Sequence, residues 1–222
     1  MGGCSRLILL IHTFLYAIAL ILALKIYDVA VVPGLTKVGL STLNGWFRNL
    51  WHYNEEIGYN RFWYNLTEVL GYISFVVCAF WSGLYFKEMI KSGRFDGVGV
   101  DKNLMATFWL YLIAAGLCVL FRFVTVNYRP IMMPGKTSLT ASFPSVHVIL
   151  FIVAWGSTIF HLVEMLEKNK QLMICLCIVC GVIMALGIFG RMICGVSWFT
   201  DIIGGILIGS TLILLYSFFF DI

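Results

Sequence analysis

Charged residues are scarce in this chain. Only 12% of its 222 residues are Asp, Glu, Lys or Arg, whereas soluble domains average about 25%. So few charges beside 61% hydrophobic residues exclude an intrinsically disordered chain. The net charge of +4, from 15 basic and 11 acidic residues, is too small for a nucleic-acid-binding surface. We therefore expect no nucleic acid partner.

Metal-binding and disulfide patterns are also missing. The seven cysteines are an odd number and lie mostly in apolar runs, which excludes a disulfide-stapled secreted scaffold. Cys175, Cys177 and Cys180 have a metal-like spacing, but no His or carboxylate lies beside them. We interpret them as small apolar side chains of a membrane helix. The sequence predicts no metal site and no cofactor.

Long apolar runs are what the chain has instead. A helix that spans a bilayer needs about 20 mainly apolar residues, and six runs meet this requirement. They are the run between Arg6 and Lys25, 69–86, 103–121, the run that begins near Pro144, 171–190 and 202–220. The sequence therefore predicts one all-α membrane domain over residues 1–222, with six transmembrane helices and an uncleaved first span.

The orientation of these spans follows from their number and from the basic residues. Six spans place both termini on the same side of the lipid bilayer. Basic residues are nearly balanced between the two sides, but the short loop KEMIKSGRFDGVGVDK favours the cytoplasm. We predict an integral protein of the plasma (cytoplasmic) membrane with both termini in the cytoplasm.

An aromatic segment separates the first two predicted spans. TLNGWFRNLWHYNEEIGYNRFWYNLTE combines charges and amides with six Trp and Tyr residues, which are Trp46, Trp51, Tyr53, Tyr59, Trp63 and Tyr64. Such amphipathic rings are typical of the headgroup region. We predict an interfacial segment here; a lipid entry gate is the alternative.

Three polar clusters lie at the ends of the later spans. They cover 122–130, 142–147 and 191–201. Ionisable groups at membrane depth are costly and mark functional sites. In a six-helix chain these three span ends face the same side, so we expect the clusters to converge in an active site that faces outward.

The chemistry of the clusters points to phosphate. The guanidinium groups of Arg122, Arg129 and Arg191 suit bidentate binding of phosphate oxygens. Pro144 suits a first helical turn, so the free backbone N–H groups of Ser145, Val146 and His147 are expected to point at an anion.

The order and spacing of these residues resemble the type 2 phosphatidic acid phosphatases, membrane lipid phosphate phosphatases related to vanadium haloperoxidases. That family carries Lys-x6-Arg-Pro, then Pro-Ser-Gly-His, then Ser-Arg-x5-His-x3-Asp. The corresponding motifs here are Arg122-x6-Arg129-Pro130, Pro144-Ser145-Val146-His147 and Gly190-Arg191-x5-Ser197-x3-Asp201. The resemblance covers residues 122–201.

This resemblance implies a role for each matching residue. The phosphate ligands would be Arg122, Arg129, Ser145, Val146 through its amide, and Arg191. His147 would be the general acid, Asp201 would orient the nucleophile, and Ser197 occupies the slot of the nucleophilic histidine. The implied activity is metal-free hydrolysis of a phosphorylated lipid substrate, such as phosphatidic acid, phosphatidylglycerol phosphate or undecaprenyl pyrophosphate.

The serine in the nucleophile slot makes low or absent activity the expectation. A serine hydroxyl needs a base or a metal to attack, and Asp201 is a weak base for an alcohol. His52, in the aromatic segment, is a replacement only if that segment folds inward. Three explanations stay open: a natural binding protein without efficient hydrolysis, a phosphatase whose nucleophile was replaced deliberately, and weak activity through direct attack by water.

An anion transporter or a structural membrane protein is the alternative from another class. Its arginines would then form an anion path, but that hypothesis predicts no particular motif spacing. The sequence does not identify the lipid or the oligomeric state.

Overall fold

The computed structural model describes residues 3–31, 37–51, 53, 58–93, 99–133, 135 and 137–220. Its described residues form seven helices and one short antiparallel sheet. The elements are α1 (Gly3–Ile26), β1 (Ala30–Val31), β2 (Lys37–Val38), α2 (Ser41–Asn49), α3 (Arg61–Ser92), α4 (Lys102–Phe123), α5 (Val146–Met165), α6 (Lys170–Cys194) and α7 (Phe199–Tyr216).

Six of these helices are long and apolar enough to cross a membrane, namely α1 and α3 to α7. They coincide with the six apolar runs, so the prediction of an all-α polytopic membrane protein is confirmed. The largest difference concerns α3, which begins at Arg61 rather than at the predicted Val69. It starts earlier because the Asn60 side chain accepts a hydrogen bond from the Trp63 N–H at 3.2 Å and caps the helix.

The bundle is centred on α5 and α7. Half of the residues in their spans are buried, against 11–22% in the other four. Small residues allow the two helices to approach: a Cβ atom on Gly205 would lie 2.9 Å from Cβ of Val148, and one on Gly209 would lie 3.0 Å from Cβ of Ile152. This close packing of backbones is typical of membrane helix pairs.

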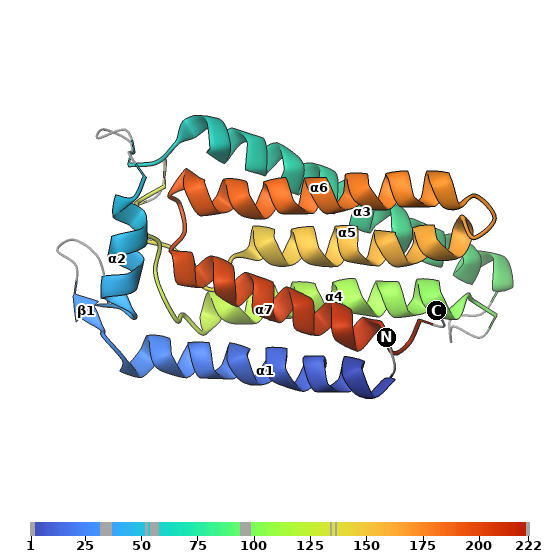
Figure 1. Ribbon diagram of the computed structural model, residues 1–222, viewed down its shortest axis with the longest axis horizontal. Helices are drawn as coiled ribbons and strands as arrows, with labels where there is room; N and C mark the ends of the chain where they lie inside the picture. Colours follow the sequence, from blue (N-terminus) through green and yellow to red (C-terminus); the bar gives the residue numbers. More distant parts are fainter. Residues whose placement is uncertain are drawn as a thin grey trace.

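The two ends of the bundle differ. Both chain termini lie at one end, and α2 lies across the other (Figure 1). The α4–α5 connection and the α6–α7 turn are at the α2 end. Lys25 Nζ donates a hydrogen bond to the Thr125 carbonyl at 2.7 Å, which ties the end of α1 to the α4–α5 connection. The three polar clusters of the sequence therefore meet beneath α2.

The predicted interfacial aromatic segment contains α2 and the start of α3. Trp46 on α2 is 60% exposed, whereas Tyr59 is 6% exposed and packs against Cys194 and Val196. Asn44 is the buried residue of α2, and its side-chain amide donates to Thr200 Oγ1 at 3.0 Å, which fixes α2 over the start of α7. His52, the alternative catalytic histidine, lies outside the described residues.

Candidate active site

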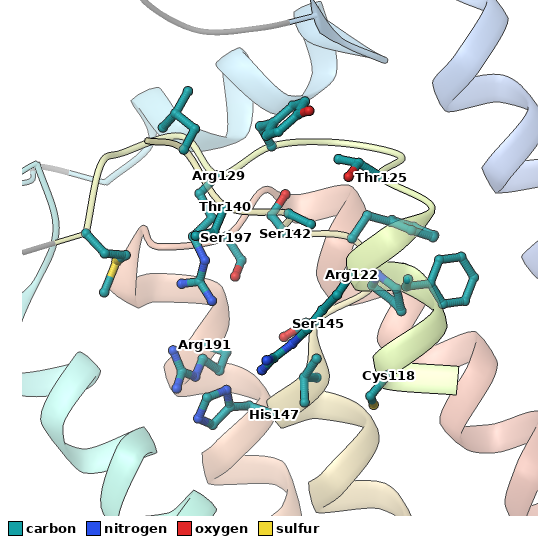
Figure 2. Close-up of a pocket in the computed structure, with 18 of the residues that line it drawn as sticks. Cys118, Arg122, Thr125, Arg129, Thr140, Ser142, Ser145, His147, Arg191 and Ser197 are labelled. Atoms are coloured by element: carbon teal, nitrogen blue, oxygen red, sulfur yellow. The ribbon is translucent and has the colours of Figure 1, made fainter. Parts of the chain in front are cut away.

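A pocket of about 830 Å³ lies at the α2 end of the bundle. Seven of the eight predicted site residues line it, which are Arg122, Arg129, Ser145, Val146, His147, Arg191 and Ser197. Figure 2 shows Arg122, Arg129, Arg191 and His147 directed into the same space from different elements. The expected convergence of the three clusters is therefore present in the structure.

The three arginines reach the pocket from separate segments. Arg191, in the last turn of α6, is 1% exposed. Arg122 is in the last turn of α4, and Arg129 follows in the α4–α5 connection, where its N–H donates to the Thr140 carbonyl at 3.0 Å. Burial, and next the Arg191 charge, lower the pKa of Arg129. Within the described part of the chain, the guanidinium groups of Arg122 and Arg129 have no hydrogen-bond partner and are free to bind an anion.

The start of α5 forms the floor of the pocket, and it differs from the prediction in one respect. Helix α5 begins at Val146 with Ser145 as its N-cap residue, so Pro144 precedes the first turn. The Ser145 N–H donates to the Asp201 carbonyl at 2.9 Å and is not free for an anion. The prediction of a free Ser145 N–H was wrong because it neglected this contact with α7. The first-turn N–H groups of Val146 and His147 keep the orientation that favours an anion.

Glu68 is a pocket residue that the sequence reasoning missed. Its Oε1 accepts a hydrogen bond from Arg191 Nη2 and lies 3.3 Å from His147 Nε2. The Glu68 side chain is 28% exposed, compared with 2% for that of Arg191. The residue directly precedes the predicted second span, and it enters the pocket because α3 starts two turns earlier than expected. A carboxylate at the edge of an apolar run was the available signal.

Ser197 and Asp201 occupy the α6–α7 turn and the first turn of α7. Ser197 is half-buried and lines the pocket. Asp201 is fully buried behind it, and its Oδ2 accepts a hydrogen bond from the Trp198 N–H at 2.8 Å. Its Oδ1 has no hydrogen-bond partner in the described part of the chain. Ser197 does not donate a hydrogen bond to this carboxylate in the described structure.

Metal ligands do not gather anywhere in the described ranges: no group of three or more His, Cys, Asp or Glu side chains is arranged to hold an ion. Cys175 on α6 is exposed and Cys180 is buried, as expected for positions on different faces of a helix.

Comparisons with known proteins agree with this architecture. Residues 123–221 match the model of the PAP2 superfamily. A search among curated proteins gives no match. Among solved structures, the fold is similar to the "first transmembrane PAP2 type phosphatidylglycerolphosphate phosphatase from Bacillus subtilis", with a TM-score of 0.66 and 18% sequence identity over 95% of this chain and 94% of that one. The family-model match over residues 123–221 confirms the resemblance that the motifs predict, and the fold is similar to that of a transmembrane PAP2-type phosphatase.

Proposed function

We propose that this chain binds the phosphate group of a membrane lipid in the pocket at the α2 end, and that hydrolysis is slow because Ser197 replaces the nucleophile. The observation that carries the proposal is the convergence of Arg122, Arg129 and Arg191 with His147 on one pocket. Three guanidinium groups neutralise a phosphate dianion that is held away from bulk water.

The ligand set is completed by the floor of the pocket. The N–H groups of Val146 and His147 lie at the positive end of the α5 dipole, where a phosphate oxygen is favoured. The Ser145 hydroxyl is a further donor, since this side chain has no hydrogen bond in the described structure. His147 Nε2 is the proton donor for the departing alcohol or phosphate.

An apolar groove beside the pocket supports a lipid rather than a water-soluble substrate. This groove has a volume of about 480 Å³ and lies between α1, α4 and α7. Thr211 is the one polar residue among those that line it, and Phe121 lines both the groove and the phosphate pocket. From Leu10 to Ile21 the α1 wall extends about 16 Å along the helix. A hydrocarbon chain lying in this groove would place its phosphorylated end at the arginines.

The chemical step is where the site is incomplete. An attacking Ser197 hydroxyl needs a base, and the carboxylates of Glu68 and Asp201 are engaged with Arg191 and with the Trp198 N–H. We infer that the chain mainly binds lipid phosphates, with direct attack by water as the source of any residual turnover. The single domain of residues 1–222 supplies both the phosphate pocket and the groove.

The test compares phosphate release from phosphatidic acid and from a prenyl pyrophosphate by this chain and by Ser197→His. We expect low release by the chain and a gain of at least about 100-fold in the variant, the lower limit for one well-placed catalytic group. Introducing Arg129→Gln into the histidine variant should abolish the gain. Efficient turnover by the unsubstituted chain that His147→Ala abolishes would refute the argument from Ser197. Anion flux in proteoliposomes without phosphate release would favour the transporter hypothesis.

We further propose that the pocket faces the outside of the cytoplasmic membrane and that both termini are cytoplasmic. The termini lie at the bundle end opposite α2 (Figure 1), and Lys87 and Lys91 near the end of α3 and Lys102 at the start of α4 favour the cytoplasm. In intact cells, a membrane-impermeant maleimide should label Ser138→Cys, which is exposed near the pocket, above the background of the unsubstituted chain. It should not label Lys168→Cys, which is exposed in the α5–α6 turn. The reverse pattern would invert the orientation.

A further inference from the structure

The Glu68 carboxylate lies among groups that the proposed function assigns to phosphate. One oxygen, Oε1, contacts both Arg191 Nη2 and His147 Nε2. We propose that Glu68 occupies the place of a phosphate oxygen between Arg191 and His147 in the empty site, so that a lipid phosphate binds by displacing it. This inference rests on the proposed function, because it takes the pocket to be a phosphate site.

The packing of α3 directs Glu68 to this position. Tyr64, Glu68 and Gly71 are three or four residues apart and therefore share one face of the helix. Tyr64 lies under the Arg191 guanidinium, whose Cζ is 5.6 Å from the ring centre. At Gly71 a Cβ atom would be 2.9 Å from His147 Cδ2, so the absence of a side chain lets α3 approach α5 closely. The carboxylate is held against the Arg191 guanidinium and the His147 ring by the backbone position of α3.

The burial of Arg191 explains why an anion is needed beside it, and the partial exposure of Glu68 explains how that anion can leave. The Arg191 side chain is 2% exposed, and a buried charge without a partner is strongly destabilising. Glu68 supplies the partner when no substrate is bound. Its own side chain is 28% exposed and lines the pocket, so it can turn toward water when a phosphate takes over Arg191.

Arg122 and Arg129 have no comparable partner in the described structure. They are open to an incoming phosphate, whereas Arg191 and His147 are already occupied. A carboxylate and a phosphate bind a guanidinium through the same oxygen geometry, and two anions on Arg191 repel each other. Glu68 therefore competes with the phosphate and lowers its affinity.

The position of Glu68 does not suit a catalytic base. In-line displacement at phosphorus puts the attacking and leaving oxygens on opposite sides. Glu68 contacts Nε2 of His147, which is the proton donor on the leaving-group side in the proposed function. It is therefore placed to affect phosphate binding and not to activate the nucleophile.

Titration calorimetry with inorganic phosphate tests this competition, using the full chain in detergent at low salt and neutral pH. Glu68→Gln keeps the size of the side chain and removes its charge. We expect phosphate to bind on the order of tenfold more tightly to this variant, which corresponds to about 1.4 kcal/mol. The matched control is Glu167→Gln, an exposed glutamate in the α5–α6 turn at the other end of the bundle, which should leave the affinity unchanged. A structural defect would weaken binding, so a gain identifies a competitor.

Several results would overturn the proposal. If the unsubstituted chain binds phosphate and Arg129→Gln weakens that binding, but Glu68→Gln gives no gain, the proposal fails while the phosphate site stands. If neither the chain nor Glu68→Gln binds phosphate, the proposal and the proposed function both fail. Glu68→Ala provides a second variant if Glu68→Gln does not fold. Misfolding of both even with excess phosphate present would also refute displacement, because the phosphate should then replace the carboxylate as the partner of Arg191.

Discussion

Gly71 offers a sharp test of how closely α3 approaches the candidate site. A Cβ atom at this position would lie 2.9 Å from His147 Cδ2 and 3.3 Å from Nε2, inside the optimal carbon–carbon separation of about 3.5–4.0 Å. Gly83 on the same helix is the matched control, since a Cβ atom there meets nothing within 4 Å. Both substitutions add the same methyl group, and they differ only in the atoms that this methyl group contacts.

The expected magnitudes follow from this geometry. An alanine in a helix interior is more favourable than glycine by about 0.5–1 kcal/mol, and Gly83→Ala should keep this gain. At Gly71 the methyl group must push the His147 ring aside, and overpacking of this kind costs about 1–3 kcal/mol. The free energy of unfolding of Gly71→Ala should therefore be about 1–3 kcal/mol below that of Gly83→Ala.

Unfolding in mixed micelles with increasing sodium dodecyl sulfate, followed by circular dichroism, measures this difference. If Gly71→Ala is as stable as Gly83→Ala, α3 does not press on His147 as the structure indicates. The packing of α3 against His147 would then not be what holds Glu68 in the pocket.

Two further predictions concern the α2 end of the bundle. Asn44→Ala leaves the Thr200 N–H and hydroxyl without their buried partner, so the free energy of unfolding should fall by about 1–3 kcal/mol. Asn49 is exposed on the same helix, and Asn49→Ala should change the free energy of unfolding little. Equal effects of the two substitutions would refute the role of Asn44. The hydrogen bond from the Thr42 N–H lowers the pKa of Asp28 in the folded chain. The ionised Asp28 carboxylate therefore stabilises the fold above the unfolded pKa of about 3.9. This stabilisation is lost as the pH falls through the lower pKa of the folded state. Asp28→Asn should therefore reduce the acid dependence of thermal unfolding, and an unchanged pH profile would contradict this.

The architecture was predictable because membrane spans are encoded locally. Each apolar run between charges became a helix, since a bilayer leaves the backbone few other ways to satisfy its hydrogen bonds. The start of α3 was missed because its first two turns carry Arg61 and Glu68, and the charges conceal the helix from a hydropathy argument. The Asn60 cap that begins it is a weak signal in a segment rich in amides.

The sequence motifs predicted which of their residues lie together in the candidate site, but not the contacts that depend on how the helices pack. The convergence of Arg129, His147 and Arg191 followed from the order of the spans. The pairing of the Ser145 N–H with the Asp201 carbonyl did not, because it depends on how α5 and α7 pack. Glu68 was missed for the same reason: no sequence spacing connects it to motifs that follow it by more than fifty residues.

The central claim is that the arginines of this pocket bind the phosphate of a lipid. Its most direct test is the affinity for a short-chain phosphatidic acid, measured on the chain and on Arg129→Gln, with Arg61→Gln as the control arginine at the same end of the bundle but outside the pocket. Losing one partner of a buried charge pair costs at least about 2 kcal/mol, so the account predicts binding to Arg129→Gln that is weaker by at least about thirtyfold and unchanged binding to Arg61→Gln. Equal affinity of all three proteins would contradict it.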